Sequence, residues 1–197
     1  MTAAGRIILI NGASSAGKTT LARAVQAKID GPFLHYSIDH LRDSGVLPSG
    51  RLKTREFRWA QMREAFFDGF ERSVVGFAAG GNDLIVDHIM ESRAWAVRFA
   101  RRLAGLDVFF VGLRCPVEEL ERRERARGDR PLGDARRDHQ TVHGYCLYDA
   151  EFDGTVQADA NAERLIALWL ARLRPSAIEK MAMWDLDNVA RGETRGA

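Results

Sequence analysis

The chain has 197 residues, 46% of them hydrophobic and 28% charged, which is typical of a single folded domain and not of a disordered segment. Its 29 basic and 27 acidic residues leave a formal charge of +2, which gives no general reason to expect binding to nucleic acid or to an anionic membrane. The two cysteines, Cys115 and Cys146, lie far apart without metal-ligand spacing, so neither a zinc site nor a disulfide framework is predicted. No apolar run approaches the roughly 20 residues of a membrane span, and we expect a soluble cytoplasmic protein.

The first predicted elements are a strand over 7–10, a glycine-rich loop and a helix that begins near Leu21. The loop matches the pattern G-x-x-x-x-G-K-T, which binds nucleotide phosphates when a strand precedes it and a helix follows. Its backbone N–H groups can approach an anion, Lys18 adds a charge at the β- and γ-phosphates, and Thr19 offers a hydroxyl oxygen to Mg²⁺. The alternative is a glycine-rich turn that binds nothing. The residues predicted to bind the nucleotide are Gly12, Ala13, Ser14, Ser15, Ala16, Gly17, Lys18, Thr19 and Thr20.

Strand-like and helix-like patterns alternate along the rest of the chain. Further strands are predicted over 33–38, 83–87, 107–113 and 150–153, and helices over 54–79, 94–103, 117–126, 133–142 and about 165–173. In the helix over 54–79, one face is predicted to carry Phe66, Phe70, Val74 and Phe77. The segment from 42 to 53 has glycines, a proline and few apolar residues, and is predicted to be a long loop. The alternation predicts an α/β domain over 1–175 with a parallel sheet covered on both faces.

The last segment, 176–197, carries apolar residues among many charges. Two interpretations stay open: an added helix that docks on the domain or on a second subunit of a homodimer, and a partly ordered tail. Residues 191–197 are expected to be disordered.

Two of the predicted strands end on an aspartate. Asp39 follows the strand over 33–38, and Asp87 closes the strand over 83–87. Ligands of open parallel sheets bind at the carboxyl ends of the strands, so both carboxylates would flank the γ-phosphate. We assign Asp87 to the metal, directly or through water, and Asp39 as the general base that takes a proton from an acceptor hydroxyl. The alternative for Asp87 is a strand-terminal aspartate that caps a turn.

Arginines crowd the predicted helix over 117–126 and the residues after it. They are Arg122, Arg123, Arg125, Arg127 and Arg130, interspersed with Glu118, Glu119, Glu121 and Glu124. About half are expected only to be solvated or to pair with these glutamates one turn away. Arg123, Arg127 and Arg130 share a face if the helix persists, and a lid bearing them would stabilise the charge that develops on a transferred phosphoryl group.

Two further features lie near the predicted site. His88 follows Asp87 and is interpreted as a hydrogen-bonded scaffold residue, although its position would also suit an acceptor site. Trp59, Met62 and Phe66 have helical spacing and would either wall an apolar acceptor pocket or pack in the core, with core packing favoured for Phe66.

Taken together, these residues resemble chloramphenicol phosphotransferase and its relatives from about Arg6 to Leu173. The resemblance rests on the loop Asn11 to Thr19, Ile38-Asp39, Ile85-Val86-Asp87, Val111-Gly112-Leu113-Arg114-Cys115, Ala126-Arg127-Gly128-Asp129-Arg130, Val142-His143 and Tyr148-Asp149. The order of the two central motifs, Val-Gly-Leu-Arg-Cys and then Ala-Arg-Gly-Asp-Arg, is far more specific than the loop alone.

The resemblance implies a small P-loop kinase fold with five parallel strands in the order 2-3-1-4-5. It implies transfer of the γ-phosphoryl group of ATP, with Mg²⁺, to a hydroxyl of a small molecule, with Asp39 as base and Arg123, Arg127 and Arg130 as lid arginines. The chain departs from the family at His88, where a second acidic residue is expected, over 42–58, and after Pro175. These departures concern the acceptor, so chloramphenicol and antibiotic resistance follow less directly than the chemistry.

Two alternatives remain beside a small-molecule kinase. One is a kinase of a nucleoside, a nucleotide sugar or a nucleic-acid end, although no stacking platform for single strands is visible. The other is an ATP-binding regulatory module without turnover, which would have no need of a base. A GTPase is disfavoured because no N-K-x-D motif follows the fourth strand.

Overall fold

The computed structural model describes residues 3–127 and 133–184, so that Arg130 and the segment 191–197 lie outside the described residues. In this part of the chain, five parallel strands form one sheet in the order β2-β3-β1-β4-β5. The strands are β1 (Arg6–Asn11), β2 (Leu34–Ser37), β3 (Leu84–His88), β4 (Asp107–Arg114) and β5 (Ala150–Asp153).

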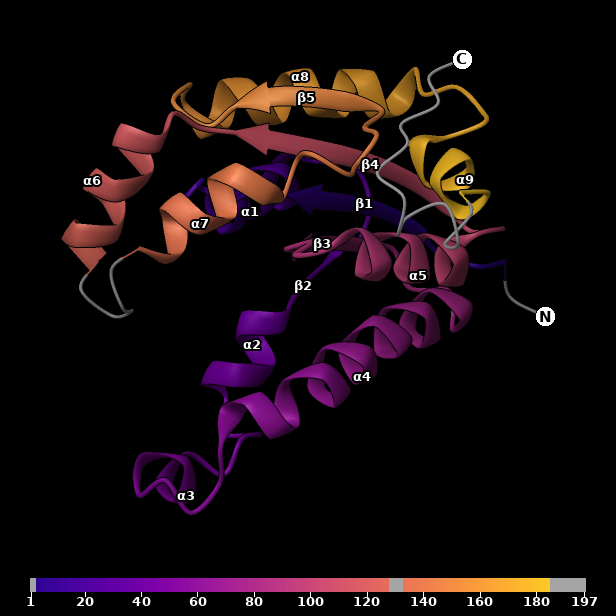
Figure 1. The fold of residues 1–197 in the computed structure, drawn as a ribbon. Coiled ribbons are helices and arrows are strands. Elements are labelled where there is room, and N and C mark those ends of the chain that lie inside the picture. The colour runs from indigo at the N-terminus through magenta and orange to yellow at the C-terminus, as the bar shows by residue number, and fades with distance from the viewer. Residues whose placement is uncertain (1–2, 128–132, 185–197) are drawn as a thin grey trace.

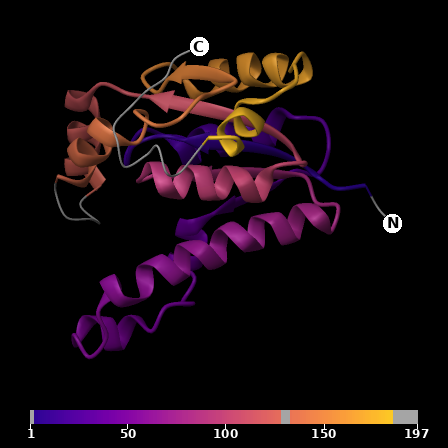
Figure 2. The same ribbon diagram turned by 45° about the vertical axis from the view of Figure 1, so that its right-hand side comes forward.

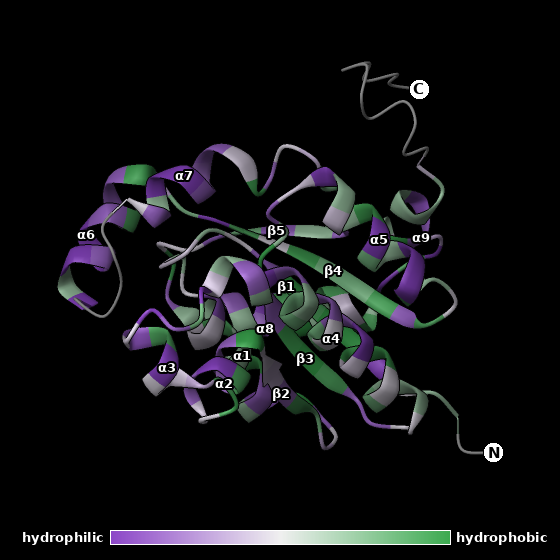
Figure 3. Ribbon diagram, turned by 60° about the horizontal axis from the view of Figure 1, so that its bottom comes forward, coloured by the Kyte–Doolittle hydropathy of each residue, from purple (hydrophilic) through white to green (hydrophobic). Residues whose placement is uncertain are grey.

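The central strand, β1, is apolar on both sides because helices cover both faces of the sheet. Ile8 and Ile10 pack into one core and Ile7 and Leu9 into the other, and all four are fully buried. Figure 3 shows the same hydrophobic character in β3 and β4, which lie beside β1. A continuous apolar run in this strand is therefore the consequence of its place in the middle of the sheet.

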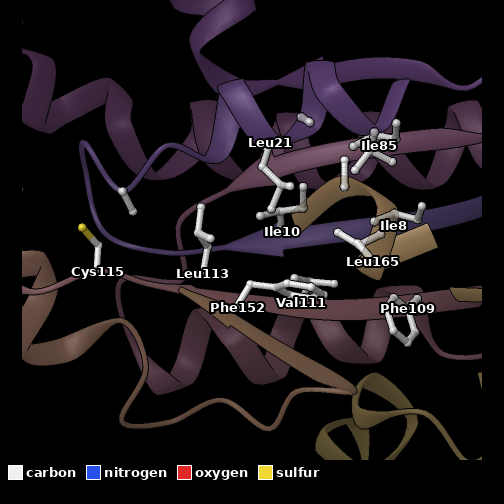
Figure 4. Packing of buried hydrophobic residues seen from close by; sticks show 14 of the residues in the cluster. Ile8, Ile10, Leu21, Ile85, Phe109, Val111, Leu113, Cys115, Phe152 and Leu165 are labelled. Atoms are coloured by element: carbon white, nitrogen blue, oxygen red, sulfur yellow. The ribbon is translucent and has the colours of Figure 1, made fainter. Parts of the chain in front are cut away.

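Helices α1 (Lys18–Lys28) and α8 (Ala158–Leu170) cover one face. Leu21 of α1 and Leu165 of α8 are buried against Ile8, Ile10 and the facing side chains of β4, as Figure 4 shows. This packing fixes α1, and with it the loop that joins β1 to α1, relative to the sheet.

Three helices cover the opposite face: α4 (Trp59–Ala79), α5 (Arg93–Leu103) and α9 (Ala177–Ala182). Figures 1 and 2 show α4 and α5 side by side, with α9 next to α5. Ala177, Ile178 and Met181 of α9 are buried in this core. The start of the segment after Pro175 thus packs on the same chain. None of the described helices is long and apolar enough to span a membrane.

The segment around Asp39 differs from the sequence prediction. Strand β2 ends at Ser37, and Asp39 lies in the first turn of helix α2 (Ile38–Asp43), where the Ser37 side chain accepts a hydrogen bond from the Asp39 N–H and caps the helix. The prediction of a long loop over 42–53 is also partly wrong, because this segment contains a second short helix, α3 (Ser49–Lys53).

The predicted apolar face of the helix over 54–79 is partly wrong. The helix begins at Trp59, its glycines do not interrupt it, and its buried face is formed by Phe67, Phe70, Glu71, Val74 and Ala78. Phe77 is 42% exposed. Glu71, fully buried, lies on this face and pairs with Arg98 and Arg102 of α5.

The carboxyl ends of the strands meet at one edge of the sheet. The register pairs Asn11 with both His88 and Gly112, and Asp87 with Ser37. In Figure 1, α2 lies at this edge together with α6 (Val117–Arg127) and α7 (Asp134–Thr141). The polar ends of three strands and these helices therefore lie at the same edge of the sheet.

Candidate active site

The loop between β1 and α1 is shaped by its two glycines. A side chain at Gly12 would place its Cβ 2.6 Å from the carbonyl oxygen of Leu113, and Gly17 has a φ of 96°, a conformation that L side chains rarely adopt. Helix α1 begins directly after Gly17, so its unpaired N–H groups face the loop. The Lys18 ammonium lies over the loop and donates to the carbonyl oxygens of Gly12 (2.9 Å) and Ala13 (2.8 Å). The geometry of this loop is compatible with the anion binding that the motif predicts.

A cavity of about 600 Å³ opens on this loop. Residues 14–20 line it on one side, Arg122, Arg123 and Arg127 of α6 on a second, and residues 154–158 on a third. Its volume lies within the range of small-molecule and cofactor sites, roughly 300–1,000 Å³. The contribution of 154–158 was not predicted, because only the pairing of β5 beside β4 brings this turn to the loop.

Arg123 holds α6 against the loop. Its guanidinium donates to the carbonyl oxygens of Ala16 (3.3 Å) and Gly154 (2.9 Å), while its Nε pairs with Glu119 at 2.6 Å. Arg122 pairs with the same glutamate. Of the three predicted lid arginines, the structure thus brings Arg123 and Arg127 to the cavity, and Arg130 is outside the described residues.

Glu124 does not pair with an arginine of α6. Its carboxylate is only 5% exposed and accepts hydrogen bonds from the N–H groups of Gly133 and Ala135, both at 2.9 Å. It thereby caps the start of α7 and joins α6 to α7.

Asp87 is buried at the end of β3, with 3% of its surface exposed. One carboxylate oxygen accepts from the Ser37 hydroxyl at 2.5 Å, and the other lies 2.9 Å from His35 Nε2. Burial alone would raise the pKa of Asp87, but the hydrogen bonds from His35 and Ser37 and the charge of Lys18 outweigh it and lower the pKa to about 2. Asp87 is therefore an anion at neutral pH. Sequence reasoning did not find Ser37 and His35 as its partners.

Asp39 stands between two cavities. Its side chain is 34% exposed and pairs with Arg42, one turn along α2, at 3.0 Å. It lines the cavity at the glycine-rich loop and also a second cavity of about 510 Å³. Ser14, Lys18, Asp39 and Asp87 are the residues shared by both linings. A group bound in one cavity would meet a group bound in the other at these four residues.

The second cavity has an aromatic wall. Trp59 and Phe66, with ring centroids 5.6 Å apart, line it together with Phe67, whereas Met62 does not. Phe66 lines this wall and also packs against the core, and a role of the wall in acceptor binding stays a prediction. Charged side chains of the second cavity form ion pairs with one another. Arg63 pairs with Glu91, and Arg137 pairs with Asp134 (2.9 Å) and Asp138 (3.2 Å).

Asp138 of α7 ties this cavity to the loop. It is 4% exposed, and its carboxylate accepts a hydrogen bond from the Ser14 N–H at 3.2 Å. Burial raises its pKa above the ordinary value. Nothing in the local sequence distinguishes this aspartate from the exposed charges around it, so it was not predicted.

His88 contradicts the prediction of a hydrogen-bonded scaffold residue. It is 1% exposed, and neither ring nitrogen has a hydrogen-bond partner in the described part of the chain. The rings of Phe67, Phe70 and Phe99 surround it at centroid distances of 5.7, 5.0 and 5.6 Å. Burial lowers the pKa of His88 to about 3, so the imidazole is neutral.

Comparison with known proteins identifies the family. A family model described as chloramphenicol phosphotransferase-like protein matches residues 5–170. The chain belongs to the chloramphenicol phosphotransferase-like family. Two relatives from Mycobacterium tuberculosis, Putative O-phosphotransferase MT2714 (strain CDC 1551) and Putative O-phosphotransferase Rv2636 (strain H37Rv), are each 32% identical to it over 172 residues. That alignment covers 77% of this chain and 76% of each relative.

Solved structures agree on the fold of this family member. The M. tuberculosis APS kinase CysC in complex with AMPPNP and APS superposes with a TM-score of 0.63 at 19% identity, covering 84% of this chain and 98% of its own. Shikimate kinase from Acinetobacter baumannii in complex with shikimate gives 0.55 at 19% identity, covering 85% and 94%. The predicted family, the P-loop kinase fold and the strand order 2-3-1-4-5 are confirmed.

Proposed function

We propose that this protein transfers the γ-phosphoryl group of ATP to a hydroxyl group of a small molecule. The observation that carries the proposal is the pair of cavities that meet at Ser14, Lys18, Asp39 and Asp87. One cavity opens on a phosphate-binding loop and the other has an aromatic wall, so a donor and an acceptor would face each other across a lysine and two carboxylates. Membership of a family whose relatives are named as O-phosphotransferases supports the same reaction class.

The nucleotide would lie in the larger cavity. The N–H groups of the loop and of the first turn of α1 would hold the β- and γ-phosphates, with Lys18 leaving its loop carbonyls for the phosphate oxygens. Arg123 and Arg127 would then stabilise negative charge during transfer. The remaining end of the cavity, at residues 154–158, would receive the nucleoside.

Thr19 and Asp87 would hold Mg²⁺. The donor set fits this ion, because a hydroxyl oxygen and an ionised carboxylate are oxygen ligands, and Mg²⁺ is commonly held by one or two carboxylates plus phosphate oxygens and water. When bound, the ion supplies positive charge at the β- and γ-phosphate oxygens. Ser37 and His35 would keep the Asp87 carboxylate oriented toward that position.

Asp39 would act as the general base. A carboxylate at the junction of the two cavities is placed to accept the proton of an acceptor hydroxyl as its oxygen attacks phosphorus. Arg42 would orient the carboxylate through the 3.0 Å contact along α2. The acceptor would lie against Trp59, Phe66 and Phe67.

The first experiment measures ADP release by the purified protein with Mg²⁺-ATP. The acceptor panel contains chloramphenicol, aminoglycosides, nucleosides, sugars, nucleotide sugars and short RNA ends. Stimulation by chloramphenicol would make antibiotic resistance part of the function, and stimulation by another hydroxyl compound would assign a different acceptor. Tight ATP binding without stimulation by any compound would favour the regulatory module.

Asp39→Asn tests the role of the base with the acceptor found in that panel. We expect kcat to fall by about 10²- to 10⁴-fold, the usual contribution of a general base, while the Kd for ATP stays within a few-fold. Asp43→Asn is the matched control, because Asp43 lies on the same helix, also contacts Arg42 and lines neither cavity. Loss of ATP binding in Asp39→Asn would instead identify Asp39 as a metal ligand.

A further inference from the structure

His88 is a buried polar residue to which the proposed reaction gives no role. It lies at the carboxyl end of β3, next to Asp87, and it is one of the residues that line the second cavity. Both of its ring nitrogens are closed to solvent and lack a hydrogen-bond partner in the described part of the chain. Buried polar groups are nearly always paired, so an unpaired imidazole at a cavity calls for a physical explanation.

The surroundings of His88 suit an apolar side chain better than a histidine. Three phenylalanine rings pack on it, and no hydrogen bond from residues 3–127 or 133–184 holds its orientation. A leucine or phenylalanine there would avoid the cost of removing two nitrogens from water without replacing their hydrogen bonds. An imidazole at this place therefore lowers the stability of the free protein, and a ligand that forms a hydrogen bond with it could restore that stability.

We propose that His88 is a specificity-determining residue that forms a hydrogen bond with an uncharged polar group of the acceptor in the aromatic-walled cavity. The inference rests on the proposed function and names the chemical class of its acceptor. Because both nitrogens are covered in this structure, a neighbouring ring shifts when the acceptor binds. Phe67 is the ring in place to do so, since it packs on His88 and lines the cavity.

The charges of the cavity favour an uncharged acceptor. Among the residues that the structure describes, five carboxylates and four basic side chains line it, and one of the basic groups is Lys18 of the phosphate-binding loop. The three arginines are already paired with carboxylates of the same lining. A phosphate or carboxylate on the acceptor would have to displace one of these partners or lie close to the carboxylates of the lining. An acceptor that carries a hydroxyl, amide or carbonyl group on an apolar molecule would neither displace an ion-pair partner nor be repelled by the carboxylates.

The inference is tested with a near-isosteric pair of variants of the full chain, His88→Leu and His88→Gln. Both remove the imidazole, but only glutamine retains hydrogen-bonding atoms. With the neutral acceptor that the wild type uses best in the panel, we expect kcat/KM to fall about 10- to 100-fold in His88→Leu and much less in His88→Gln. The Kd for ATP should be unchanged in both. Without acceptor, His88→Leu should melt no lower than the wild type, because it removes unpaired buried nitrogens.

The charge preference is measured in matched acceptors, thymidine against thymidine 5′-phosphate and glucose against gluconate. The wild type is expected to prefer the neutral member of each pair that it uses. Preference for the anionic member would overturn the acceptor class.

The remaining outcomes separate the inference from the proposed function. If the wild type transfers phosphate to no compound, the proposed function fails and the inference fails with it. If the wild type is active and His88→Leu matches His88→Gln in kcat/KM, the proposed function stands and the role of His88 is wrong. Should His88→Leu not fold, His88→Phe, which retains a ring among the three phenylalanines, takes its place in the comparison.

Discussion

At the scale of single residues, Ser37 joins the two carboxylates of the site. Its hydroxyl donates to Asp87 and accepts from the N–H of Asp39, so one buried side chain connects β3 to the first turn of α2. We expect Ser37→Ala to lower the free energy of unfolding by about 1–2 kcal/mol, because Asp87 loses a donor and α2 loses its cap. It should also lower kcat by about 10- to 100-fold through misplacement of Asp39. Urea unfolding and ADP release measure the two effects.

Ser176→Ala is the matched control for this variant. Ser176 caps α9 in the same way, accepting a hydrogen bond from the Glu179 N–H at 3.3 Å, but it lines neither cavity. It should therefore lose stability and keep its kcat. Equal activity losses in both variants would mean that Ser37 acts only through stability.

At the scale of elements, the position of the arginine-bearing helix depends on Glu124. This buried carboxylate holds the N–H groups of Gly133 and Ala135, so α6 and α7 are joined where they surround the cavities. Glu124→Gln retains one acceptor oxygen and turns the other into a donor facing an N–H group. We expect the KM for ATP to rise several-fold, with a stability loss of about 1–3 kcal/mol, because one capping bond becomes a repulsive contact. Steady-state kinetics and urea unfolding measure these changes.

Glu121→Gln supplies the comparison on the same helix. Glu121 makes an exposed pair with Arg136, and exposed pairs contribute at most about 1 kcal/mol. Its KM for ATP should equal that of the wild type. Because the Glu121–Arg136 pair also joins α6 to α7, a similar rise in both variants would show that the buried cap made by Glu124 is not what determines nucleotide binding.

Sequence reasoning succeeded where structure is local. The strand, loop and helix around Lys18 follow from hydrophobic periodicity and from glycines that the backbone requires, and the four-residue strand β5 was also found. It failed where contacts with an element distant in the sequence determine which side chains are buried or paired. The buried face of α4 includes Glu71, which pairs with arginines of α5, and the rings that surround His88 come from α4 and α5. Neither is visible in the residues around Glu71 or His88.

At the scale of the whole molecule, a buried network joins the root of the phosphate-binding loop to the segment before β5. Asn11, fully buried, donates to the carbonyl oxygen of Val142 (2.9 Å) and to the Tyr148 hydroxyl (2.7 Å), and accepts from the Met90 N–H (2.9 Å). The Tyr148 hydroxyl also lies 2.7 Å from His143 Nδ1. Burial lowers the pKa of His143 to about 4. This histidine therefore stays neutral in the folded protein at a pH where the unfolded chain binds a proton.

The consequence is a loss of global stability in mild acid. Between pH 7 and pH 5 the unfolded state takes up a proton on this side chain, whose ordinary pKa is about 6.5, while the folded state does not until the pH approaches 4. Stability present above pH 6.5 is therefore lost as the pH falls, by at most about 2 kcal/mol at pH 5. Urea unfolding gives the free energy of unfolding at pH 7 and at pH 5. The decrease between these two values should be smaller by that amount in His143→Gln than in the wild type. His139→Gln, which removes an exposed histidine from α7, should keep the wild-type difference. If the two variants respond alike, the acid sensitivity does not arise in this network.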